Sequence, residues 1–112
     1  MDDLIQILER KTRELEKSIK MLRQNGTEAA IAEREYKIAL REEALKMRDA
    51  GEAVGMINLI IYGVPRVAEL RFKRDVAQTI YDANREHINA TKLEMRIIEG
   101  QINREWGTEV PD

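Results

Sequence analysis

The sequence predicts an all-α fold, a helical hairpin or three-helix bundle with one very long C-terminal helix and coiled-coil-like packing. The 112 residues are 43% apolar and 36% charged but only 4% aromatic, a composition typical of long amphipathic helices. Two prolines and six glycines are too few for the many turns of a β-sandwich or barrel. Cysteine is absent, which excludes disulfides, thiolate metal sites and cysteine nucleophiles.

Glycine and proline mark where the helices should begin and end. Gly26 suits the left-handed residue after a helix end, and Thr27 can cap the helix that follows. Gly51 marks a second end, and Pro65 can open the last helix at its first turn. Whether the first two helices form a hairpin or run on as one stays open. Within a single domain over residues 1–112, the predicted elements are helices at about 2–24, 28–49, 55–62 and 65–106 and a frayed tail at 107–112.

The first and last predicted helices carry apolar residues in steps of three and four. The first helix has one such stripe, which consists of Ile5, Leu8, Thr12, Leu15, Ile19 and Leu22. It should pack antiparallel on the C-terminal half of the last helix. The last helix has two stripes on different faces, and a helix of that kind needs neighbours on both. A homo-oligomer, most simply a dimer, would cover the second stripe. The candidate interface residues are Val76, Ala83, Ala90, Leu93 and Ile97.

A basic cluster lies at the start of the last helix and consists of Arg66, Arg71, Phe72, Lys73 and Arg74. The helix dipole disfavours cations at this end, which indicates binding of an anion or of an acidic partner surface. Phe72 could stack on a base of a single-stranded nucleic acid. The alternative is that these cations pair with Glu and Asp of neighbouring helices.

The apolar stretch at 54–64 is too short to span a bilayer as a helix, so no membrane segment is predicted. We interpret it as a short helix that plugs the end of the bundle, with an interfacial anchor as the alternative. His87, the single histidine, should lie on the solvated surface. We expect no catalytic residue, no metal site and no cofactor, because nucleophile motifs and phosphate-binding loops are missing. The acidic start Met1-Asp2-Asp3 does not look like a signal peptide, so a cytoplasmic location is expected.

Several segments carry a family resemblance. Y-G-V-P-R-V-A-E-L-R-F-K-R-D-V-A begins at Tyr62, N-R-E-H-I-N-A-T-K-L-E-M-R-I-I-E-G-Q-I-N-R-E-W ends at Trp106, and L-E-R-K-T-R-E-L-E-K begins at Leu8. Over most of its length the sequence resembles small helical proteins encoded by phages and prophages of Gram-positive bacteria. Such proteins tend to be encoded among recombination and replication genes and carry no assigned activity. The resemblance implies an accessory protein of the bacterial cytoplasm and supplies no role for any residue.

Three functions remain as hypotheses. The first is a non-enzymatic phage accessory protein that acts by protein–protein interaction, for example with a recombination or replication factor. The alternative is an anti-defence protein that sequesters a signalling nucleotide or blocks a host immune protein. The second alternative is binding of single-stranded nucleic acid through the cluster at 66–74.

Overall fold

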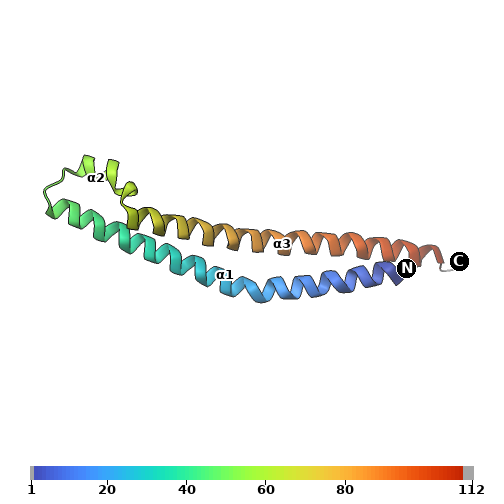
Figure 1. Ribbon diagram of the computed structural model, residues 1–112. Coiled ribbons are helices and arrows are strands. Elements are labelled where there is room, and N and C mark those ends of the chain that lie inside the picture. The colour runs from blue at the N-terminus through green and yellow to red at the C-terminus, as the bar shows by residue number, and fades with distance from the viewer. Residues whose placement is uncertain (1, 110–112) are drawn as a thin grey trace. The chain divides into compact units, whose positions relative to one another are not determined.

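The computed structural model describes residues 2–109, and all the elements among them are helical (Figure 1). In chain order they are α1 (Asp2–Asp49), α2 (Val54–Ile60), the 3-10 turn η1 (Ile61–Gly63) and α3 (Pro65–Glu109). The predicted all-α class is therefore confirmed, together with the very long C-terminal helix that packs along the first helix.

The chain divides into two compact units, and α1 and α3 each contribute a segment to both. The terminal unit combines residues 1–24 with 82–112, and the central unit consists of residues 25–81. Each unit thus has its own pair of α1 and α3 segments. The prediction of a single domain over residues 1–112 stays a prediction.

The predicted break between helices 2–24 and 28–49 is wrong, because α1 continues through Gly26 without interruption. A Cβ atom on Gly26 would lie 3.1 Å from Cε1 of the Tyr81 ring, so the missing side chain makes room for that ring. Among the described glycines only Gly51 has a positive φ, at 88°. The signal at Gly26 therefore reflects a close approach of α1 and α3 within the central unit and not a helix end.

The end of α1 and the start of α3 lie where the sequence predicts them. Glu52 N–H donates to the Met47 carbonyl and Gly51 N–H to the Arg48 carbonyl, both at 3.0 Å, which is the Schellman pattern of a glycine-terminated helix. Pro65 is the first residue of α3. That helix continues to Glu109, so the predicted tail at 107–112 begins too early, and its residues 110–112 lie outside the described part of the chain.

The core of the central unit lies where α1, α2, η1 and the start of α3 meet. Tyr36 of α1 packs with Ile57 of α2, Ile61 of η1 and Val67 of α3, and all four side chains are buried. Around them pack the half-buried residues Leu40, Ala44, Met47, Val64 and Leu70. The interpretation of the short apolar segment as a plug is confirmed for the face that carries Ile57 and Ile61.

The terminal unit has a smaller and more polar core. Ile88 and Thr91 of α3 are buried, Thr91 with only 1% of its surface exposed. The Asn84 amide donates to the Ser18 carbonyl at 3.0 Å, and Lys11 Nζ lies 2.6 Å from Glu94. The hydrogen bond to Glu94 raises the pKa of Lys11 above its ordinary value. Ser18 thus pairs with Asn84, and Lys11, earlier in α1, pairs with Glu94, later in α3. The two segments are therefore antiparallel, as the sequence predicts.

Candidate functional site

Arg66, the first cation of the basic cluster, is held by two carboxylates of α1. Its Nη1 lies 2.8 Å from Glu42 Oε2 and 3.4 Å from Glu43 Oε1. The hydrogen bond to Glu42 raises the pKa of Arg66, with a further contribution from Glu43. In turn, hydrogen bonds from Lys46 and then Arg66 lower the pKa of Glu43. Arg66 therefore ties the start of α3 to α1.

Arg74 is the most enclosed cation of the cluster. Its guanidinium lies over the buried ring of Tyr36, 4.5 Å from the centroid, and 3.5 Å from Glu33. Asp75 accepts from Arg74 Nε at 2.9 Å, and this hydrogen bond raises the pKa of the guanidinium. Stacking on a ring combined with ion pairing is typical of an arginine that holds two helices together.

The remaining members of the cluster are more exposed. Arg71 lies over the Tyr62 ring, 5.0 Å from its centroid. Lys73 is 4.0 Å from Glu69 one helical turn earlier, and both side chains are largely in solvent. Phe72 has 63% of its surface exposed. The geometry thus agrees with the alternative interpretation for Arg66 and Arg74, which pair with acids of α1, while binding of an anion by the cluster stays a prediction.

Sequence reasoning did not identify the aromatic rings and carboxylates that receive these cations. No motif in the sequence links Tyr36 to Arg74. The pairing depends on which turn of α1 lies opposite which turn of α3. No motif within either helix shows this register.

A shallow hollow of about 180 Å³ lies beside Phe72 in the central unit. Mostly apolar side chains line it, and its lining residues are Asn25, Glu28, Phe72, Lys73, Val76, Ala77 and Ile80. Its size suits one side chain of a partner better than a nucleotide, which needs a pocket of several hundred Å³.

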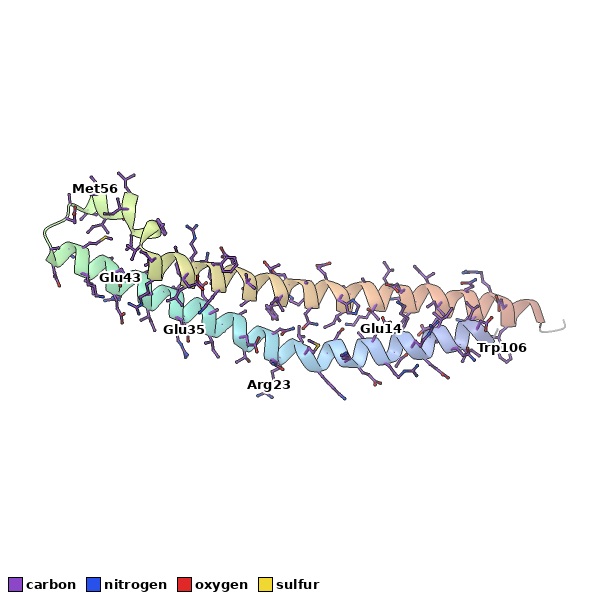
Figure 2. All side chains as sticks on the ribbon, viewed as in Figure 1. Glu14, Arg23, Glu35, Glu43, Met56 and Trp106 are labelled. Carbon is purple, nitrogen blue, oxygen red and sulfur yellow. The ribbon has the colours of Figure 1, made fainter. Side chains whose placement is uncertain are left out.

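The outer face of α2 and η1 is an exposed apolar surface of the central unit. We call it the α2 outer face, and it consists of Val54, Met56, Leu59, Ile60 and Tyr62. Leu59 exposes 78% of its surface, and Met56 is labelled on this helix in Figure 2. No charged residue occurs between Glu52 and Arg66. The plug predicted from the sequence therefore has a second apolar face, which is exposed apart from the Tyr62 ring beneath Arg71.

The candidate interface residues of α3 are exposed as well. Leu93 and Ile97 in the terminal unit expose 55% and 59% of their surface, and Ala83 and Ala90 beside them also face solvent. Val76 in the central unit is exposed to 41%. In each unit, therefore, the α1 segment does not cover these residues of α3.

Other site types have little support in the described chain. His87 is exposed, as predicted. Among the described residues no cluster of three or more His, Asp or Glu could hold a metal ion. Nor does any helix between residues 2 and 109 have the length and apolarity to cross a membrane.

Comparisons of the chain with protein-family models, with curated proteins and with solved structures give no match. The resemblance to phage-encoded helical proteins therefore stays a prediction.

Proposed function

We propose that the protein is a non-enzymatic interaction protein that binds a partner protein through the α2 outer face. The observation that carries the proposal is the exposure of five large apolar side chains on a segment whose opposite face is packed into a core. Exposed apolar patches of this kind mark binding surfaces on soluble proteins. The partner implied by the family resemblance is a phage recombination or replication factor.

The spacing within the α2 outer face suits insertion into a groove. Met56, Leu59 and Ile60 stand at positions i, i+3 and i+4, the anchor spacing of helices that dock in hydrophobic grooves. Ile57 and Ile61 fix the same segment to the core from the other side. Because the segment is already ordered, binding would cost little conformational entropy, which favours affinity.

The surrounding charges favour a protein partner over a lipid surface. Interfacial helices typically carry Lys and Arg on a strongly polar face, but α2 carries no charged residue at all. Of the charges near the apolar stretch, Arg48 is offset by Asp49 and Glu52, and Arg66 already pairs with Glu42 and Glu43. Arg71, which lies over the Tyr62 ring, is then the one further cation at this face among the described contacts. Such a balance gives little attraction to anionic lipid headgroups.

Paired variants test the proposal. We expect the protein to retain a partner protein from the cytoplasm of its host, and Leu59→Ser with Ile60→Ser to weaken the reconstituted complex by more than about tenfold. Met21→Ser, which changes an exposed apolar residue of the terminal unit, should leave the affinity unchanged. Equal affinity of the two variants would contradict the proposal.

Two further probes address the competing functions. Sedimentation with phosphatidylcholine and phosphatidylserine vesicles, if lost in the α2 variant, would replace the protein partner by a lipid surface. Binding of an oligothymidylate that weakens steeply with salt would support the nucleic-acid hypothesis instead. The proposal expects neither.

A further inference from the structure

We propose that a second copy of this chain covers the outer stripe of α3 in the terminal unit, with the two α3 segments antiparallel. We define the outer stripe as Ala83, Glu86, Ala90, Leu93, Ile97 and Gly100. This inference concerns a different unit from the α2 outer face, so either proposal can fail without the other.

The outer stripe has the spacing of a coiled-coil seam. Its members follow one another in alternating steps of three and four residues. Residues seven apart, such as Ala83, Ala90 and Ile97, differ by only about 20° around an α-helix. The outer stripe is therefore continuous along the helix.

The outer stripe is separate from the residues of α3 that pack against α1 of the same chain. Asn84, Ile88 and Thr91 define the inner strip, which is buried or half-buried toward α1. Leu93 and Ile97 lie on the outer strip and are more than half exposed. Regular seam spacing with large aliphatic residues in solvent indicates a helix with a missing neighbour.

Charge decides against a parallel second copy. A parallel arrangement sets each residue against its own equivalent, so Glu86 would face Glu86 of the other copy within the seam. Two carboxylates in a partly desolvated seam repel one another. The same arrangement would set Ala90 against Ala90 and Leu93 against Leu93. Pairs of small side chains would then alternate with pairs of large ones, and the two helices could not pack closely at both.

An antiparallel copy removes the repulsion between carboxylates and evens out the central layers. When Ala90 faces Leu93 of the second copy, Glu86 faces Ile97 and Ala83 faces Gly100. A small residue then lies opposite a large one at the centre, and each Glu86 can lay its methylene groups on isoleucine while its carboxylate stays at the wet edge.

The flanking residues agree with this register. His87 lies beside the seam on the same side as Glu94. In the antiparallel register His87 of one copy lies next to Glu94 of the other, whose half-exposed carboxylate also pairs with Lys11 of its own chain. Two-fold symmetry repeats the contact. On the opposite side, Arg96 of one copy lies next to Asn89 of the other, so no like charges meet.

Sedimentation equilibrium at micromolar concentration tests the second copy. We expect a mass of about 26 kDa for the native chain, twice its 13.0 kDa. Leu93→Glu should shift the protein to 13.0 kDa with unchanged helical circular dichroism, because Leu93 is exposed within the chain. Met21→Glu introduces the same charge at an exposed apolar residue of α1 in the same unit and should remain dimeric. A native mass of 13.0 kDa, or equal dissociation of both variants, would overturn the proposal.

Engineered cysteines test the direction, since the native chain has none. In the antiparallel register, two Ala83→Cys residues would lie about 25 Å apart, far beyond disulfide reach. Ala83→Cys alone should therefore not cross-link under mild oxidation, whereas an equal mixture with Gly100→Cys should give a disulfide-linked dimer. Lys92→Cys, which lies off the stripe, serves as the control for random oxidation. Cross-linking of Ala83→Cys alone would indicate a parallel pair, and no cross-link in the mixture above the Lys92→Cys level would also refute the register.

Discussion

The ring of Tyr81 lies against the backbone of Gly26, so that a Cβ atom at residue 26 would be 3.1 Å from ring atom Cε1 and 3.3 Å from Cζ. Contacts between 3.0 and 3.4 Å are tighter than most real Cβ contacts, so the ring would have to move by a few tenths of an ångström. The contact explains why a residue with poor helix propensity sits within a helix of 48 residues.

A double-mutant cycle should separate the two effects of Gly26. Alanine at a helix-interior glycine gains about 1 kcal/mol from helix propensity. We expect Gly26→Ala to stabilise the native chain by less than that, because the new methyl group crowds Tyr81, and to reach the full gain in a Tyr81→Ala background. Urea unfolding followed by circular dichroism measures both steps, and equal gains in the two backgrounds would show that the ring does not constrain residue 26.

The sequence predicts the ends of helices better than their continuity. Gly51 and Pro65 work through local geometry, a left-handed residue and a fixed φ, and both mark the ends expected of them. Gly26 is also a glycine, but here the small residue makes room for the Tyr81 ring of α3. Asn25 before it is of a type common at helix ends, yet it is buried within α1. Only the pairing of α1 with α3 distinguishes the two kinds of glycine, and no short-range pattern encodes that pairing.

Two glycines near the α1–α2 connection should respond to alanine with opposite signs. Gly51 has φ 88°, a left-handed conformation that costs an L-residue about 1–2 kcal/mol, so Gly51→Ala should destabilise the chain. Gly55 lies in the first turn of α2, and a Cβ atom added there would have no neighbour within 4 Å. Gly55→Ala should therefore stabilise the chain by up to about 1 kcal/mol. Thermal melts measure both, and a loss of stability in Gly55→Ala would contradict this account.

Arg74 should be sensitive to the shape of its side chain as well as to its charge. Arg74→Lys keeps the positive charge near Glu33 but loses the planar group over Tyr36, so we expect a loss of about 0.5–1 kcal/mol. Lys73→Arg is the matched control, because Lys73 lies in solvent and has no ring beneath it among the described contacts. If both exchanges left the melting temperature unchanged, the Tyr36 contact would contribute nothing to stability.

The double change Arg71→Ala with Arg74→Ala distinguishes pairing from binding in the basic cluster. Breaking a fully buried ion pair costs about 3–5 kcal/mol, but the pairs of Arg74 are partly exposed, at 26% for its own side chain. We therefore expect the melting temperature to fall by less than about 10 °C, at about 4–8 °C for each kcal/mol. A larger loss would end the interpretation of this cluster as a binding surface.

Residue spacing predicts which faces are apolar better than it predicts which residues those faces contact. The second stripe, which runs through Leu93, follows from residue spacing alone. The stretch at 54–64 is predicted as a plug, and the exposure of its outer face around Leu59 is not predicted. By contrast, the contacts of Arg66 with Glu42 and of Arg74 with Tyr36 join residues far apart in sequence. Periodicity shows which face of a helix is apolar, but it does not show which turn of another helix lies opposite.

Glu43 should make the stability of the central unit depend on pH on the acid side. Hydrogen bonds from Lys46 and Arg66 lower its pKa below the ordinary 4.5, so the unfolded chain binds a proton more readily than the folded chain. Its contribution is complete above pH 4.5 and is lost as the pH falls through the lowered pKa. We expect Glu43→Gln to lower the melting temperature at pH 7 and to differ less from the native chain at pH 3. Glu35→Gln, an exposed carboxylate of α1 (Figure 2), is the control, and a constant difference for Glu43→Gln would contradict the assignment.

Truncation of a side chain should destabilise the chain on one face of the segment at 54–63 and have little effect on the other. Ile61 is buried among Tyr36, Ile57 and Val67, so Ile61→Ala leaves a cavity and should cost about 2–5 kcal/mol. Leu59 exposes 78% of its surface, and Leu59→Ala should change stability by less than about 0.5 kcal/mol. Urea unfolding with equal m-values measures both. A surface whose apolar side chains do not stabilise the fold is free to serve binding, so a cost for Leu59→Ala close to that of Ile61→Ala would show that this face is part of the core and would remove the basis for partner binding there.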